Sequence, residues 1–375
     1  MRMPTARLFS TTAAAIMAAL ALVLAFTGTG TAQQQGGVPT FEVDPDWPQV
    51  PDNWVLGEVT SIAVDSEDDI WVLHRPRSIP EAQRAQAAPP VLEFDAEGRL
   101  LRSWGGPGDG FDWPEREHGI QIDAAGHVWI TGNGGWPKPS PDGSTDDMVL
   151  EFTADGTLVK QIGRRGASIG NADRGNVHQP GDAFVHAKTG ELFVADGYGN
   201  NRVIVFDAAT GAFKRMWGAF GNTPEAPAGR GAAPAGPDGP PQFGLVHAVK
   251  VSNDDVVYVA DRSNNRIQTF TVEGTYLRQV SIATGEGEPA GVPAGFAFSP
   301  DPGQRLLYVV DSGPMRIVVF DRQSLAQIGA IGMRGAGPGE FDIVHHMAAD
   351  SKGNLYTAEI VNNRRAQRLV LQPAR

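Results

Sequence analysis

Short apolar strands separated by polar turns recur along the chain. In residues 243–270, the runs "HAVKV" and "VVYVAD" lie on either side of a polar turn at residues 252–255. Two apolar runs joined by a turn rich in Asp, Gly or Asn are typical of a β-hairpin. Similar pairs of runs cover residues 59–76, 117–133, 180–198, 246–262, 293–312 and 344–360.

Two further apolar runs follow most of these pairs and complete a four-stranded unit, as in "RIQTFTVEGTYLRQV", where Glu-Gly marks the hairpin turn. Only three strands follow residue 344, so a strand at residues 41–47 is expected to complete the last unit and close a ring. Six such units are the signature of a β-propeller. We therefore predict an all-β fold, a single six-bladed β-propeller over residues 33–375. An open sandwich would not explain six regular copies.

The composition is consistent with many short strands, and the net charge argues against nucleic acid as a partner. The 375 residues include 46 Gly and 28 Pro, which favour turns over long helices. The formal net charge of −12 leaves no electrostatic footprint for nucleic acid. The chain has no Cys, so any metal site must use His or carboxylate ligands.

The first 32 residues have the pattern of a targeting segment. Arg2 and Arg7 precede an apolar run at residues 13–26, and small residues up to Ala32 follow it. The apolar run is shorter than the roughly 20 residues of a membrane-spanning helix. We expect residues 1–32 to be a signal peptide that is cleaved on export, so that the mature protein is periplasmic or secreted and not stably inserted in a membrane.

Three insertions are predicted on one face of the propeller. Residues 78–90 and 134–147 lie between the second and third strands of their units, and residues 222–242 lie between two consecutive units. In a propeller both kinds of loop emerge on the same face. Long loops on a rigid scaffold commonly carry function, so we expect the functional site on this face.

Histidine occupies one position in every second unit. The first residue of the innermost strand is His in the second, fourth and sixth units, and it is small in the others. Innermost strands line the central channel, so three His in alternate blades would converge at one level. Three His with no fourth protein ligand are the arrangement of a catalytic zinc site. The predicted ligands are His118, His247 and His345, with Thr60, Gly181 and Ala294 between them.

A plainer interpretation is that three buried histidines are each hydrogen-bonded separately. It does not account for their place at one level in alternate blades, so we favour the metal site. His346 follows the third predicted ligand. Strand alternation predicts that its side chain points to the other side of the strand, to pack there or to support the ligands.

Three polar residues follow second strands on the face where the histidines begin: Arg75, Tyr198 and Arg262. They do not recur in the other units, so stabilisation of the repeat does not account for them. Two cations and a phenol beside a metal indicate an anionic substrate and a base. Acids and arginines that do recur are expected to stabilise the blades; they are Asp196, Asp261 and Asp311 with Arg202, Arg266 and Arg316.

From about Trp54 onward the chain resembles the peptidyl-α-hydroxyglycine α-amidating lyase family. The resemblance is sharpest in "HGIQIDAAGHVWIT", "QPGDAFVHAKTGELFVADGYGNNRVIVFD", "VHAVKVSNDDVVYVADRSNNRIQTF" and "FDIVHHMAADSKGNLYTAE". It implies a six-bladed propeller of NHL-type repeats that cleaves a C-terminal α-hydroxyglycine to a peptide amide and glyoxylate. By the same resemblance, His118, His247 and His345 bind zinc, Tyr198 in "DGYGNNR" is catalytic, and Arg75 in "LHRP" and Arg262 in "ADRSNNR" lie in the active site.

The resemblance also has departures. His346 replaces an Asp that helps to hold a structural calcium ion in the family, and Ile343 replaces a Met. Calcium requires oxygen ligands, so the sequence argues against that second metal site. No organic cofactor is predicted.

The implied partner is a peptide or small molecule with a C-terminal carboxylate, and a ring closed on itself favours a monomer. Two alternatives stay open. One is another metal-dependent lyase or hydrolase that acts on a small carboxylated substrate. The other is a non-catalytic NHL propeller that binds peptide or protein ligands.

Overall fold

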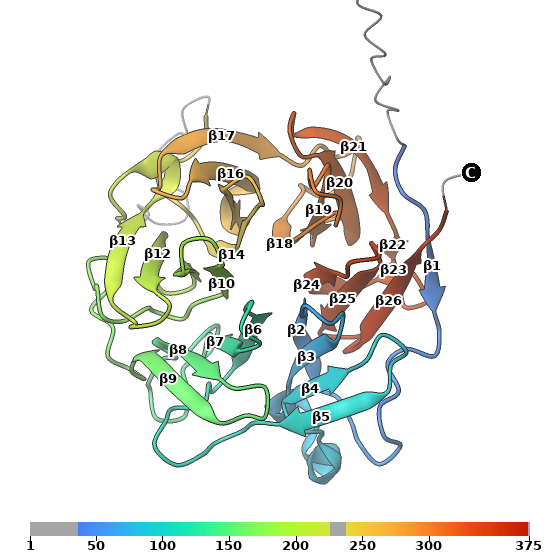
Figure 1. Ribbon diagram of the computed structural model, residues 1–375, viewed down its shortest axis with the longest axis horizontal. Coiled ribbons are helices and arrows are strands. Elements are labelled where there is room, and N and C mark those ends of the chain that lie inside the picture. Colours follow the sequence, from blue (N-terminus) through green and yellow to red (C-terminus); the bar gives the residue numbers. More distant parts are fainter. Residues whose placement is uncertain (1–36, 226–237, 374–375) are drawn as a thin grey trace, which may run out of the picture. The chain divides into compact units, whose positions relative to one another are not determined.

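Six four-stranded antiparallel sheets stand as blades around a common axis in the described residues, 37–225 and 238–373, of the computed structural model (Figure 1). The predicted six-bladed propeller is confirmed. Residues 37–375 form one compact unit. The predicted signal peptide and residues 226–237 of the third insertion lie outside the described residues, so the boundary after Ala32 stays a prediction.

Each blade runs outward from an innermost strand at the axis. Blades one to three contain β2 (Glu58–Val64), β3 (Ile70–Arg75), β4 (Val91–Phe94) and β5 (Leu100–Trp104); β6 (Glu117–Ile122), β7 (Val128–Gly132), β8 (Met148–Phe152) and β9 (Leu158–Gly163); and β10 (Asp182–His186), β11 (Glu191–Asp196), β12 (Arg202–Asp207) and β13 (Phe213–Trp217). Blades four and five contain β14 (Val246–Val251), β15 (Val256–Asp261), β16 (Arg266–Thr271) and β17 (Tyr276–Ser281); and β18 (Pro293–Phe298), β19 (Leu306–Asp311), β20 (Arg316–Asp321) and β21 (Ala326–Ile331).

The sixth blade joins the two ends of the propeller. It contains β24 (Ile343–Ala349), β25 (Leu355–Ile360) and β26 (Ala366–Leu371), and β1 (Phe41–Asp44) pairs antiparallel with β26. The expected closing strand is therefore confirmed. Its pairing covers the edge that β26 would otherwise present to solvent.

Short elements fill the connections between the strands. They are η1 (Pro76–Ser78), η2 (Glu81–Gln86), η3 (Ala219–Gly221), η4 (Arg262–Asn264) and the parallel pair β22 (Met333–Arg334) and β23 (Glu340–Phe341). Within the described ranges, no helix is long and apolar enough to cross a membrane.

Apolar side chains pack between neighbouring blades. The described residues form six core clusters, and each cluster joins one pair of adjacent blades. Strands in the middle of a blade are therefore covered on both faces, which explains near-continuous apolar sequences such as "LLYVVD" in β19, where every residue is buried. The outermost strands β5 and β17 expose part of their residues to solvent.

The recurring acid–arginine pairs join the second and third strands of a blade, as the repeat predicts. In blade three, Arg202 Nε donates to Asp196 Oδ2 over 2.7 Å, and both side chains are fully buried. The Arg202 guanidinium also donates to the carbonyl oxygens of Asn171 and Asn176 at 2.7 and 2.8 Å. In blade five, the equivalent Arg316 is 17% exposed and lies 3.2 Å from Asp311.

We expect Arg202→Ala to lower the free energy of unfolding by about 3–5 kcal/mol, because it leaves the buried Asp196 without its cation. Arg316→Ala is the matched control, and we expect a smaller loss because water reaches that pair. Denaturant unfolding of both variants measures the difference. Equal losses would contradict the dependence on burial.

Candidate metal centre and active site

A bulge near the start of three innermost strands sets the direction of the predicted ligands. In β14, Val246 pairs with Asp261 and Ala248 pairs with Ala260, so His247 is an extra residue. The register shifts in the same way around His118 in β6 and around His345 in β24. A bulge bends a strand and re-aims its side chains. All three histidines are buried, and all three belong to one cluster.

Hydrogen bonds between blades fix the orientation of each imidazole. His118 Nδ1 lies 2.6 Å from the carbonyl oxygen of Gly181, and His247 Nδ1 lies 2.7 Å from that of Ala294. His345 Nδ1 lies 2.6 Å from the carbonyl oxygen of Thr60. A carbonyl only accepts hydrogen bonds, so each Nδ1 carries the proton and donates. The small residues predicted only to leave room therefore also supply the acceptors.

The remaining nitrogens present bare lone pairs to one another. Burial, followed by neighbouring positive charges, holds the pKa of His118, His247 and His345 well below its ordinary value, so the rings are neutral. With Nδ1 protonated, Nε2 of a neutral ring is an acceptor only. His247 Nε2 and His345 Nε2 nevertheless lie 3.3 Å apart. Two acceptors at this distance repel unless a cation lies between them.

A fourth histidine belongs to the same cluster. One ligand nitrogen from each of His118, His247, His345 and His346 lies within 4.8 Å of the others. The bulge at His345 breaks the strand alternation, so His346 does not point to the other side of the strand. The predicted direction of this side chain was wrong, and its predicted role in packing or in supporting the ligands stays a prediction. The sequence carried a signal in the adjacent pair "HH", but only the backbone shows that both rings reach the axis.

Arg75 is held rigidly at the end of β3 with one nitrogen free. It is 2% exposed; its Nε donates to the carbonyl oxygen of Glu117 at 2.7 Å, and its Nη1 donates to Glu58 Oε2 at 2.6 Å. Its Nη2 is buried and has no partner among the described residues. A buried donor without a partner is unfavourable, so this atom is suited to an anionic ligand.

Tyr198 lies against the first of the histidines. Its hydroxyl is 2.9 Å from His118 Nε2 and donates to it, because that nitrogen is the acceptor of the ring. The ring of Trp136, from the second predicted insertion, packs edge-on against Tyr198 with centroids 4.8 Å apart. The phenol is thus within hydrogen-bonding distance of a ligand atom.

The other cations near the site are Arg262 and Arg116. Arg262 is half-buried in η4, and its charge contributes to the lowered pKa of His247. Burial, followed by repulsion from Arg75, lowers the pKa of Arg116 to about 10. Arg116 was not among the predicted site residues, because it does not follow a second strand. The criterion that selected Arg75, a cation on this face that does not recur, would also have selected it.

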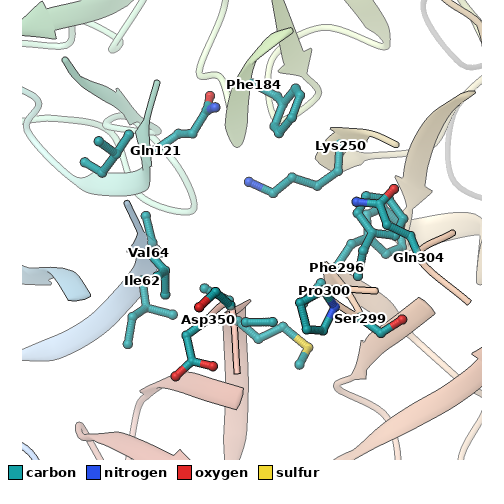
Figure 2. A pocket seen from close by; sticks show the side chains of 18 residues that line it. Ile62, Val64, Gln121, Phe184, Lys250, Phe296, Ser299, Pro300, Gln304 and Asp350 are labelled. Carbon is teal, nitrogen blue, oxygen red and sulfur yellow. The ribbon is translucent and has the colours of Figure 1, made fainter. Parts of the chain in front are cut away.

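The two ends of the channel differ in chemistry. A pocket of about 350 Å³ adjoins the site and is lined by Arg75, Arg116, Glu58 and Trp136, among others. Figure 2 shows a second pocket, of about 330 Å³, lined by later residues of the same innermost strands. There Lys250 points its amino group among largely apolar side chains. Tyr198 lies at the polar, arginine-rich end, together with the three predicted ligands His118, His247 and His345.

The residues do not fit a structural calcium ion beside the cluster. His346 offers nitrogen where calcium requires oxygen ligands. Burial, followed by the charge of Lys250, lowers the pKa of His346 to about 3, so this side chain offers a neutral nitrogen and not an anionic oxygen. The cluster contains no carboxylate that could supply oxygen to calcium.

Comparison with known proteins supports the resemblance. Residues 243–270 match the NHL repeat family. The chain is 29% identical over 292 residues to peptidyl-glycine alpha-amidating monooxygenase A of Xenopus laevis, covering 73% of this chain and 27% of that protein. It is 25% identical over 373 residues to peptidyl-alpha-hydroxyglycine alpha-amidating lyase 2 of Drosophila melanogaster, covering 88% and 75% of the two chains.

A third relative carries a more general name. The chain is 26% identical over 330 residues to NHL repeat-containing protein 3 of Homo sapiens, covering 85% of this chain and 81% of that protein. The predicted similarity to amidating lyases and to NHL propellers is thus confirmed. The chain spans only 27% of the length of the Xenopus protein, so the activity of that whole protein is not transferred.

Gly181→Ala tests the contact that holds blades three and four at the level of the histidines. An added Cβ would lie 2.7 Å from the carbonyl oxygen of His247, so backbone must move. We expect stability to fall by about 1–3 kcal/mol. We also expect weaker zinc binding, because the acceptor of His118 is displaced.

The control is Gly175→Ala, whose added Cβ meets only Asp173 Oδ1, at 3.8 Å. Thermal unfolding and zinc titration of both variants measure the effect. Native stability and affinity in Gly181→Ala would show that the blades tolerate the displacement.

Proposed function

We propose that this protein is a zinc-dependent carbon–nitrogen lyase, which cleaves a C-terminal α-hydroxyglycine to a peptide amide and glyoxylate. The observation that carries the proposal is the convergence of three imidazole lone pairs beside the hydroxyl of Tyr198. Similarity to relatives named as α-amidating enzymes supports the choice of reaction.

His118, His247 and His345 would hold the zinc ion through Nε2. In tetrahedral zinc sites, metal–nitrogen bonds of about 2.0–2.1 Å place two nitrogens about 3.3 Å apart, which is the separation of His247 Nε2 and His345 Nε2. The carbonyls that accept from Nδ1 orient the rings and raise their basicity as ligands. When bound, the ion supplies a Lewis acid beside the reacting oxygen.

Tyr198 would carry the proton through the reaction. Tyr198 would act as the phenolate, after its own proton has passed to solvent: the phenolate takes the proton of the substrate hydroxyl, the carbon–oxygen double bond of glyoxylate forms, and the carbon–nitrogen bond breaks. The same phenol then returns the proton to the departing amide nitrogen, so atoms and charge balance. Its hydroxyl lies 2.9 Å from a ligand nitrogen, so the base adjoins the metal position.

Arg75 and Arg262 would bind the substrate carboxylate. Glu58 and the backbone of residue 117 immobilise the Arg75 guanidinium, so its free Nη2 needs little reorganisation to receive an anion. The half-buried Arg262 brings a second positive charge to the same cluster, as its effect on His247 indicates. A fixed carboxylate would place the adjacent hydroxyl beside Tyr198.

The peptide part of the substrate would lie in the 350 Å³ pocket next to Arg75. Trp136 offers it an apolar surface and packs on Tyr198, so binding there is coupled to the position of the base. The guanidinium of Arg116 lies 5.8 Å from the centre of the Trp136 ring and steadies that surface.

Two other proposals differ in substrate or role. One is a non-catalytic propeller that binds peptide or protein ligands, and the similarity to NHL repeat-containing protein 3, a name without a stated reaction, leaves it open. A lyase or hydrolase for another small carboxylate would use the same ligands. Residues 1–32 support the further proposal that the protein acts after export, in the periplasm or as a secreted protein. Closure of the ring by β1 supports a monomer.

Zinc should restore glyoxylate release from an α-hydroxyglycine peptide after the protein has been treated with a chelator. His247→Ala should lower kcat/KM by roughly 100-fold or more, because one nitrogen of the centre is lost. A coupled assay for glyoxylate measures both effects. Bound zinc without glyoxylate release would reject this reaction and favour another substrate or a binding role.

Tyr198→Phe should lower kcat by about 10²–10⁴-fold, because it removes the proton-carrying group, while the zinc content stays unchanged. Tyr276→Phe is the control, since that ring packs against Phe220 outside the cluster. Activity assays combined with metal analysis separate the two effects. Full activity in Tyr198→Phe would exclude the proposed role.

A further inference from the structure

His346 is a buried imidazole that no part of the proposed reaction uses. The residue is 3% exposed, and its Nε2 has no hydrogen-bond partner in the described part of the chain. Every other histidine of the cluster has its Nδ1 on a backbone carbonyl and its Nε2 near another polar atom of the site. A buried polar atom without a partner requires an explanation.

The position of His346 points toward the metal centre. Its ring centroid lies 5.6 Å from that of His118, 5.2 Å from that of His247 and 4.9 Å from that of His345. The ring stacks on His247 with an interplanar angle of 25°. If His346 only filled space here, its Nε2 would stay without a hydrogen bond. An apolar side chain of similar size would fill the same space and bury no polar atom.

We propose that His346 is a fourth nitrogen ligand of the metal centre. The inference rests on the proposed zinc site. One ligand nitrogen of His346 is within 4.8 Å of the three others, so a modest movement of the ring brings it to the separations of a four-coordinate site. Coordination through Nε2 would give that buried nitrogen the partner that it lacks in the described residues.

A fourth imidazole changes what the centre can bind. Imidazoles are neutral ligands, so both charges of the ion are left uncompensated beside Arg75 and Arg262 whether three or four of them bind. Such a site attracts anions strongly. Four coordinated nitrogens also fill every position of a tetrahedral site. With His346 bound, an external ligand could reach the zinc ion only if the coordination number rose to five.

The test is a comparison of zinc-loaded protein with His346→Ala and His346→Gln, both without an imidazole at this position. X-ray absorption of the bound zinc counts the coordinated imidazoles, and competition with a chelating dye gives the zinc Kd. We expect four imidazoles in the native protein and three in either variant, with Kd raised roughly 10-fold or more. Circular dichroism and thermal unfolding show whether the variants fold.

His127→Ala is the matched control. This histidine lies with Asp123 and Glu151 in a separate group that can hold a metal, so the variant reports adventitious binding there. We expect the control to keep the imidazole count and the affinity of the native protein. A loss of affinity in the control as large as that in the His346 variants would overturn the assignment.

The outcomes separate this inference from the proposed function. Three imidazoles and one oxygen in the native protein, unchanged in the His346 variants, would overturn the fourth ligand and leave the lyase proposal intact. Folded protein that binds no zinc would overturn both. Four imidazoles in a protein that releases no glyoxylate would support the ligand and reject the reaction.

Discussion

Three hydrogen bonds between neighbouring blades govern the chemistry of the channel. Each joins Nδ1 of a histidine to a backbone carbonyl near the start of the next innermost strand, over 2.6–2.7 Å. The same contact selects the ring tautomer, turns Nε2 toward the axis and holds two blades in register. The centre therefore depends on closure of the ring, since no blade provides both the imidazole and its acceptor.

Closure of the ring in turn depends on apolar packing between blades that continues around the whole propeller. Each blade buries both faces against its neighbours, and strand β1 from one end of the propeller completes the sheet that begins at the other. Rigid packing of this kind lets the protein keep two buried nitrogens, Arg75 Nη2 and His346 Nε2, that have no hydrogen-bond partner in the described part of the chain. Such local costs are common where a scaffold holds a functional site.

The arrangement also separates the two ends of the channel. Arginines and Tyr198 collect where the innermost strands begin, whereas the pocket at their other end is lined mainly by apolar side chains, with Lys250, Asp350 and a few neutral polar residues (Figure 2). Loops between second and third strands reach only the first of these ends, and one of them brings Trp136 onto Tyr198. The asymmetry follows from the direction of the strands, because all six innermost strands start on the same face.

Sequence alone determined the number of blades, the closing strand and the alternation of histidines, because each is a local pattern that repeats. It also separated Arg75, Tyr198 and Arg262 from the acids and arginines that stabilise every blade. Only the tertiary structure decided the direction of His346, the proximity of Arg116 and the carbonyl acceptors. Strand alternation fails at a bulge, and bulges form where a strand must fit both its own sheet and the next blade. Contacts across blades leave no mark in the residues of either blade.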